Sequence, residues 1–280
     1  MSHHWNSDRK AQQGVPPLRA TSGARVNADV RKKENMNINK IIKWTRRAAT
    51  SAFCDFRWKS RECNPQWVGS PSGGAYVDLS RLCKDSIIYS FGIATEISFD
   101  RAIIKETGCN VYGFDPDPRS EAWLNRSETW VPPEFHFSRI ALDSTSGHRP
   151  FFITDIERMT GGFSPGMDSE QIDADCLTLA DIMKRYSNEW VDYIKMDVES
   201  AEYPIIESWL NQYDQLPVGQ LWIEFHPNGR DRTESTSKSL VKSLSRIGMV
   251  PGYRNYFRQP NNYLLINKNI ANKRPHPTAH

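Results

Sequence analysis

Short apolar runs alternate with segments of helical periodicity along most of this chain. Ile87–Phe91 and Val111–Phe114 are two such runs, and apolar residues recur at helical spacing over 97–107 between them. A short continuous apolar run is typical of a strand buried on both faces, whereas a helical repeat buries one face. The pattern predicts a strand–helix–strand unit with parallel strands.

The alternation continues toward the carboxyl end of the chain and predicts a mostly parallel sheet. Further strands are predicted over 135–141, 150–154, 176–178, 191–196 and 219–225, and further helices over 119–126, 179–186, 201–211 and 234–247. The last two apolar runs, 250–257 and 262–267, are joined by a short polar link that predicts an antiparallel hairpin. The glycine-rich stretch 161–166 predicts a flexible loop, which is either a substrate lid or a surface insertion without a role.

The first two predicted strands end in residues suited to holding a nucleoside. Gly92 follows one strand, where the missing Cβ lets the backbone approach a ligand, and Asp115 follows the other. Ligands bind beyond the carboxyl ends of such strands, where a carboxylate can accept hydrogen bonds from both hydroxyls of a ribose. The turn 91–96 contains Gly92 as its single glycine and the acidic Glu96, which disfavours the pyrophosphate of NAD. S-adenosylmethionine has a ribose and no phosphate, so this turn does not disfavour it. A nicotinamide-dependent oxidoreductase remains the alternative enzyme.

Charged residues surround the end of the predicted strand 191–196. Asp197 and Glu199 follow this strand, and Lys195 lies within it. Buried charges are costly unless they are paired or used. Two interpretations therefore stay open: a functional site, or an ion pair with Lys195 followed by acidic residues that cap the next helix.

A histidine is predicted to join this group. Glu224 and His226 are two residues apart and share one face of the predicted strand, so they would emerge beside Asp197 if the two strands are neighbours. His226 is therefore a candidate general base, and the alternative is a histidine that is only hydrogen-bonded at a strand end. Glu224 and His226 could also hold a divalent metal, but this interpretation is less favoured, and no metal site is predicted.

These motifs resemble a known family. Residues 195–202, Lys-Met-Asp-Val-Glu-Ser-Ala-Glu, resemble the Lys-Met-Asp-Val-Glu-Gly-Ala-Glu signature of FkbM-type S-adenosylmethionine-dependent methyltransferases. The main departure is Ser200, where the family usually has glycine. Four further segments, over about residues 67–267, are similar to motifs of this family or of neighbouring methyltransferase-like domain proteins: 88–93 with 98–100, 111–116, 140–143 and 221–226.

The resemblance implies a Rossmann-like α/β fold of the class I methyltransferase type, with a doubly wound, mostly parallel sheet and an antiparallel C-terminal hairpin. It implies S-adenosylmethionine as the cofactor and O-methylation of a sugar, a glycan or a small hydroxylated acceptor. The predicted cofactor-binding residues are Phe91, Gly92, Ile93, Asp115, Pro116, Ala141, Leu142 and Asp143. The predicted catalytic residues are Asp197, Glu199 and His226.

Charge is distributed unevenly along the chain. Residues 1–60 carry 13 Lys and Arg against 4 Asp and Glu, although the net charge of the whole chain is only +3. The composition of 1–36 predicts a disordered basic arm, and helical spacing over 37–53 predicts a basic amphipathic helix. Packing of this helix on the domain is favoured over contact with nucleic acid or a membrane surface through residues 1–60. A catalytically inactive module that binds RNA or anionic lipid through the arm is the alternative to an enzyme.

The predicted domain organisation has four parts. They are the arm 1–36, the helix and linker 37–66, the methyltransferase domain 67–268 and a flexible tail 269–280. No apolar run approaches the roughly 18 residues of a membrane span, and the beginning of the sequence predicts no signal peptide. The five cysteines are widely spaced, which favours reduced thiols and a cytoplasmic location.

Overall fold

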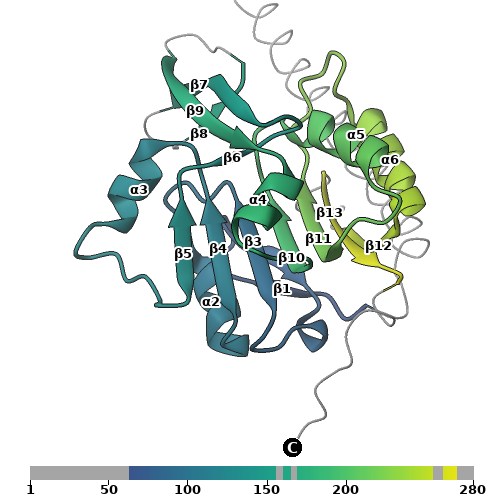
Figure 1. The fold of residues 1–280 in the computed structure, drawn as a ribbon, viewed down its shortest axis with the longest axis horizontal. Helices are drawn as coiled ribbons and strands as arrows, with labels where there is room; N and C mark the ends of the chain where they lie inside the picture. The colour runs from purple at the N-terminus through teal and green to yellow at the C-terminus, as the bar shows by residue number, and fades with distance from the viewer. Residues whose placement is uncertain (1–62, 156–159, 165–168, 255–260, 270–280) are drawn as a thin grey trace, which may run out of the picture. The chain divides into compact units, whose positions relative to one another are not determined.

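The computed structural model describes residues 63–155, 160–164, 169–254 and 261–269 (Figure 1). A seven-stranded sheet lies at the centre, in the order β12 (Met249–Arg254), β13 (Asn262–Asn267), β11 (Val218–Glu224), β10 (Val191–Met196), β3 (Ile87–Phe91), β4 (Asn110–Phe114), β5 (Phe135–Ser138). The strands from β11 to β5 pair in parallel, whereas β13 runs antiparallel to both β11 and β12. The predicted parallel sheet with an antiparallel closing pair is confirmed.

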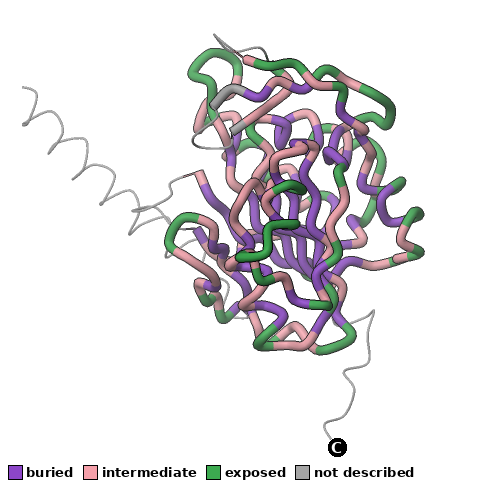
Figure 2. The backbone as a smooth tube through the Cα atoms, turned by 90° about the vertical axis from the view of Figure 1, so that its left-hand side faces the viewer, coloured by how far each residue is buried: buried purple, intermediate pink, exposed green. Residues whose placement is uncertain are grey.

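Helices cover both faces of this sheet. One face packs against α4 (Leu179–Arg185), α5 (Glu202–Gln212) and α6 (Glu234–Ser243), and the other packs against α2 (Ser98–Thr107) and α3 (Pro118–Leu124). Successive side chains of a strand point to opposite faces, so Ile194 belongs to the first core and Tyr193 to the second. Figure 2 shows the central strands as buried segments between the two layers. The doubly wound architecture is confirmed.

Local sequence explains where several helices begin and end. Thr178 precedes α4, and its hydroxyl accepts a hydrogen bond from the backbone N–H of Asp181. Thr233 precedes α6 and forms a capping box with Thr236. α2 ends at Gly108, which has a φ of +71° in the left-handed region that glycine adopts without strain.

A second sheet lies beyond the carboxyl ends of β4 and β5, near the top of Figure 1. Its strand order is β6 (Ala141–Leu142), β9 (Glu170–Leu177), β7 (Gly147–Asp155), β8 (Thr160–Gly162). The prediction of one strand over 135–141 is wrong, because the chain turns after Ser138 and Ala141 pairs with β9 instead. The prediction of a loop over 161–166 is wrong at its start, since β8 pairs with β7 there.

The structure also adds elements that the apolar pattern did not indicate. β1 (Gln66–Val68) and β2 (Ala75–Val77) form an antiparallel hairpin, and the short 3₁₀ helix η1 (Leu79–Arg81) follows it. The α-helix predicted over 234–247 ends at Ser243 and continues as the 3₁₀ helix η2 (Leu244–Ile247).

Several predictions concern residues outside the described ranges. These are the arm 1–36, nearly all of the segment 37–66, residues 255–257 of the penultimate strand, and the tail after residue 269. Within the described ranges, none of the helices combines the length and the apolar character needed to cross a membrane.

Candidate active site

A cavity of about 240 Å³ opens at the carboxyl ends of three adjacent strands, β4, β3 and β10. Gly92, Asp115 and Asp197 directly follow these strands and all line it. Eight of the predicted site residues lie in its wall: Gly92, Ile93, Asp115, Pro116, Ala141, Leu142, Asp197 and Glu199. The structure therefore brings together motifs that are far apart in the sequence.

The backbone of Gly92, directly after β3, lies against the backbone of Asp197, directly after β10. Its φ is +76°, and a Cβ atom at this position would lie 1.7 Å from the carbonyl oxygen of Asp197. The N–H of Gly92 donates to the carbonyl oxygen of Phe114 (3.0 Å), and the N–H of Asp197 donates to that of Phe91 (3.3 Å). Only glycine fits both the left-handed conformation and this close approach.

Asp115 is a buried carboxylate at the edge of the cavity. Its Oδ2 accepts a hydrogen bond from the N–H of Ala94 (2.8 Å), and its Oδ1 accepts one from the N–H of Asp117 (2.9 Å). Burial raises its pKa to about 6, although these hydrogen bonds favour the ionised form. Each oxygen keeps a further lone pair, so the carboxylate can still accept hydrogen bonds from ribose hydroxyls.

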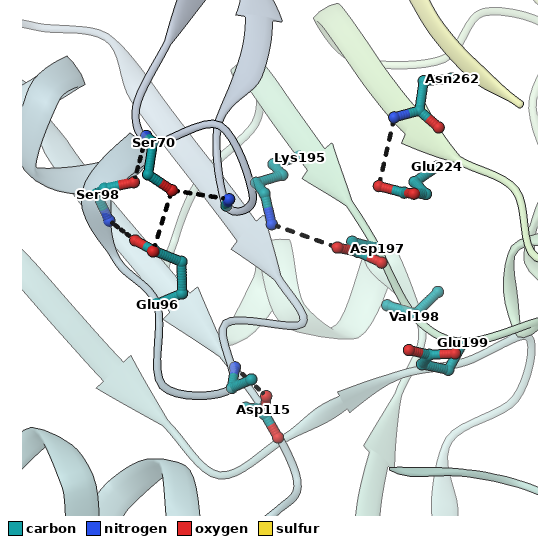
Figure 3. A network of polar contacts seen from close by, with 12 residues as sticks. Ser70, Glu96, Ser98, Asp115, Lys195, Asp197, Val198, Glu199, Glu224 and Asn262 are labelled. Atoms are coloured by element: carbon teal, nitrogen blue, oxygen red, sulfur yellow. Dashed lines mark hydrogen bonds and ion pairs between the residues drawn. The ribbon is translucent and has the colours of Figure 1, made fainter. Parts of the chain in front are cut away.

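Asp197 and Glu199 form the opposite part of the wall (Figure 3). The ammonium of Lys195, which is 5% exposed, lies 3.8 Å from Oδ2 of Asp197. Burial raises the pKa of Glu199, while the charge of His226 opposes this effect. The cavity thus has a carboxylate suited to a ribose on one side and a pair of carboxylates on the other.

His226 lies next to these acids but does not line the cavity. Its Nδ1 lies 2.9 Å from Oε1 of the buried Glu202, and its Nε2 lies 3.6 Å from Asp197 and 3.9 Å from Glu199. Burial alone would lower the pKa of His226, but the hydrogen bond with Glu202 and the surrounding negative charges raise it to about 10. A histidine that stays protonated at neutral pH does not fit the predicted role of general base.

Glu224 lies at the end of β11, near the charged side chains of Asp197 and His226. Its Oε2 accepts a hydrogen bond from Nδ2 of Asn262 at 3.3 Å (Figure 3). Burial and the negative charge of Asp197 raise its pKa to about 7. The sequence placed Glu224 beside His226, but nothing in the sequence indicated this shift, which depends on tertiary packing.

Two other predicted residues do not face the cavity. Phe91 is buried in the core, where its ring stacks on Phe114 with centroids 4.8 Å apart. Asp143 is also buried; its Oδ1 accepts a hydrogen bond from the N–H of Ser144 at 2.6 Å, and its Oδ2 pairs with Arg149. The resemblance implied a place near the adenine for this acid, whereas the structure uses its carboxylate to anchor β7.

The cavity wall also contains residues that the sequence did not single out. Ser72 and Gly73 come from the turn between β1 and β2, and Phe151 and Phe163 come from the second sheet. The rings of Phe151 and Phe163 meet edge to face, with centroids 5.5 Å apart. Neither segment carries a motif, so only the tertiary structure could place them here. Among the described residues, no group of three or more His, Cys, Asp or Glu is arranged to hold a metal ion.

Comparison with known sequences points to one family. Residues 87–250 match the family described as Methyltransferase FkbM domain. The chain is 22% identical over 143 residues to the probable methyltransferase-like protein 24 of Homo sapiens, covering 51% of this chain and 33% of that protein. It is 23% identical over 158 residues to the same protein of Rattus norvegicus, covering 56% and 38%. The chain thus spans little more than a third of the length of these relatives.

Similarity to solved structures is weak. The fibrillarin pre-rRNA processing protein of Methanococcus jannaschii is 12% identical, with a TM-score of 0.40, and the match covers 74% of this chain and 85% of that one. The TrmK protein of M. capricolum, solved with S-adenosylhomocysteine, is 10% identical, with a TM-score of 0.33, and the match covers 68% and 66%.

Proposed function

We propose that this chain, which belongs to the FkbM methyltransferase family, methylates a hydroxyl oxygen of a sugar or small hydroxylated acceptor with S-adenosylmethionine as the methyl donor. One observation carries the proposal. Asp115 and Asp197 follow the strands on either side of β3, and both line one cavity together with Gly92 and Glu199. Such a cavity has a place for a nucleoside and, next to it, acidic groups suited to an acceptor.

The residues present fit this cofactor. Asp115 would hold the ribose, because its Oδ2, bonded to the N–H of Ala94, and its Oδ1, bonded to the N–H of Asp117, each keep a further lone pair. Ala141 and Leu142 add apolar wall suited to the adenine. When bound, S-adenosylmethionine would supply a methyl group already activated on a sulfonium sulfur.

The chain itself would align the acceptor and receive its proton. Asp197 and Glu199 line the cavity, so they are the groups in place to accept a proton from an acceptor hydroxyl. Protonated His226, within 4 Å of both carboxylates, would hold them in position by attraction rather than act as the base. Carboxylates also accept hydrogen bonds from neighbouring hydroxyls, which supports a sugar or other polyhydroxylated acceptor.

The nicotinamide alternative fits this cavity less well. Glu96 lines it, and its carboxylate accepts a hydrogen bond from the N–H of Ser98 at 2.6 Å. Although burial alone would raise the pKa of Glu96, hydrogen bonds from Ser98 and Ser70 lower it, which favours the ionised form. A negative charge here opposes binding of a pyrophosphate. The other alternative, a module that binds RNA or lipid, depends on an arm outside the described residues.

Native mass spectrometry of the purified protein tests the cofactor directly, because co-purified S-adenosylmethionine or its demethylated product would be detected by mass. Asp115→Ala should weaken binding of S-adenosylhomocysteine about tenfold in calorimetry, the effect of losing one charged hydrogen bond. Asp214→Ala, at an exposed position away from the cavity, is the control. Equal affinity of the Asp115 variant and the control would count against the proposal.

A further inference from the structure

We propose that Glu202 is a positioning residue, which acts through His226 to hold Asp197 and Glu199 in place as proton acceptors. This role rests on the proposed function and deepens it, because it concerns how the same two acids are held. Glu202 is the last residue of the segment 195–202 that resembles the family signature, and it does not line the cavity. A ligand in the cavity would therefore not contact it.

Glu202 lies at the start of α5 and is fully buried. It is the first residue of the helix, and it is 0% exposed. The helix dipole favours a carboxylate in this place, but a buried charge is costly unless donors or a cation face it. Among the described residues, Oε2 of Glu202 has no hydrogen-bond partner, so the contacts of Oε1 hold the carboxylate.

Oε1 of Glu202 contacts two segments at once. It accepts a hydrogen bond from the backbone N–H of Val198 at 3.1 Å, and it lies 2.9 Å from Nδ1 of His226. Val198 lies between Asp197 and Glu199 (Figure 3), whereas His226 lies two residues after the end of β11. One buried oxygen therefore joins the backbone of the acidic turn to the imidazole beside it.

His226 transmits this contact to the two cavity acids. Its Nε2 lies 3.6 Å from Oδ1 of Asp197 and 3.9 Å from Oε2 of Glu199. Because these distances exceed those of ordinary hydrogen bonds, the attraction depends on the positive charge of the ring. Of the three acids, Glu202 is the one within hydrogen-bond distance of the imidazole, so it fixes the orientation of the ring and the proton on Nδ1.

The loop after β11 is tied to the same turn by two further hydrogen bonds. The hydroxyl of Ser200 donates to the carbonyl oxygen of His226 (2.9 Å), and Nη1 of Arg232 donates to the carbonyl oxygen of Ser200 (2.8 Å). The guanidinium of Arg232 also lies over the ring of Tyr203 on α5, at 5.4 Å. These contacts do not involve the carboxylate of Glu202, so its charge can be removed while the loop stays tied to the turn.

Several charged groups surround His226, and the experiment must separate them from Glu202. They are Asp197 and Glu199 on the turn, Glu224 on β11, and the cations Lys195 on β10 and Arg232 on the loop. Glu202→Gln removes one charge, while its side-chain carbonyl can still accept the hydrogen bond from Val198. Glu199→Gln removes a charge that lies near the ring without a hydrogen bond to it.

NMR of protein labelled with nitrogen-15 in its histidines observes the ring nitrogens, and His226→Gln identifies the signals of His226. Because the pKa of His226 is about 10, both nitrogens should carry protons in the wild type at pH 8. Glu202→Gln should lower the proton affinity of His226 at least about tenfold, the effect of losing a charged hydrogen bond. Glu199→Gln should lower it less. Glu207→Gln is the matched control, because Glu207 is exposed on the same helix, and it should leave the titration unchanged.

An effect of Glu202→Gln no larger than that of the control, or smaller than that of Glu199→Gln, would overturn the assignment. A residue that only caps the turn would not change the titration of His226, because glutamine keeps the hydrogen bond to Val198. If Glu202→Gln does not fold, as judged by circular dichroism, the wild type and Glu199→Gln decide. A doubly protonated His226 at pH 8 in both supports the assignment, and loss of a proton in either overturns it.

These measurements need no cofactor. Binding of S-adenosylhomocysteine, measured separately by calorimetry, tests the proposed function. An unchanged His226 in Glu202→Gln would leave that function standing, whereas wild-type protein that fails to bind the cofactor product would contradict the function itself.

Discussion

The hydroxyl of Ser200 donates a hydrogen bond to the backbone carbonyl oxygen of His226 at 2.9 Å. This contact ties the turn after β10 to the end of β11. The φ of Ser200 is +80°, in the region that favours glycine, and the preceding Glu199 has a φ of +49°. The family usually has glycine at position 200, so this chain keeps the glycine conformation with a residue that adds a hydrogen bond.

Two substitutions at position 200 should separate the strain from the hydrogen bond. Ser200→Ala loses the bond and keeps the strain, so we expect a loss of about 1 kcal/mol in the free energy of unfolding. Ser200→Gly loses the bond but also relieves roughly 1 kcal/mol of left-handed strain, so its stability should stay near that of the wild type. Urea denaturation measures both. An alanine variant as stable as the glycine variant would contradict this account.

The pKa of His226 predicts a pH dependence of stability. Because the pKa is raised from 6.5 to about 10 in the folded protein, the stabilisation is fully present below pH 6.5 and is lost as the pH rises through about 10. His226→Gln should therefore reduce the free energy of unfolding by roughly 1–3 kcal/mol at pH 6.5 and by little near pH 10. Urea denaturation at several pH values tests this.

The control for this experiment is His136→Gln, because His136 is exposed on β5. Its effect on stability should be small at every pH. A His226 variant whose loss of stability does not change between pH 6.5 and 10 would show that the imidazolium is not held by its acidic neighbours.

Much of the fold could be predicted because strand ends and apolar runs are local signals. Strands 87–91 and 191–196 match β3 and β10 residue for residue, and the closing hairpin follows from two apolar runs with a polar link. Asp115 and Gly92 were placed at one crevice because parallel strands end at the same edge of a sheet. The meeting of these two residues at one crevice could therefore be predicted without tertiary information.

The parts that could not be predicted depend on contacts between distant segments. Asp143 lies in a segment that is similar to a motif of the family, but its carboxylate pairs with Arg149 of β7. Sequence periodicity cannot reveal such a partner. The pKa of His226 is set by three acids on another segment, so a strand-end histidine could be placed but its protonation state could not. Phe163 lies in the cavity because β8 folds back onto β7, where a loop was predicted.

Phe163 should contribute to ligand binding through its ring. The guanidinium of Arg149 lies over this ring at 4.7 Å, and the ring forms part of the cavity wall. Phe163→Ala removes apolar wall and should weaken binding of S-adenosylhomocysteine by roughly tenfold, in line with the loss of a buried aromatic contact. Phe152→Ala is the control, because Phe152 lies on β7 but does not line the cavity. Equal affinities of the two variants in calorimetry would exclude Phe163 from the binding wall.

Glu224 predicts a pH dependence of stability in the same direction as His226, but in a lower pH range. Its pKa is raised from 4.5 to about 7, so the folded protein favours the neutral acid. The associated stabilisation is present below pH 4.5 and is lost as the pH rises through about 7. Glu224→Gln resembles the neutral acid at every pH, and its side-chain carbonyl can still accept the hydrogen bond from Asn262. The variant should match the wild type at pH 5 and exceed its stability by about 1–2 kcal/mol at pH 8.5.

The control for this comparison is a second glutamate, one that is exposed to solvent. Glu207 is exposed on α5, so Glu207→Gln should change stability little at either pH. If urea denaturation shows the Glu224 variant to be less stable than the wild type at pH 8.5, the ionised carboxylate must be held by a favourable contact. In that case Glu224 would be a charged partner of Lys195 or His226, and the proton would not reside on it at neutral pH.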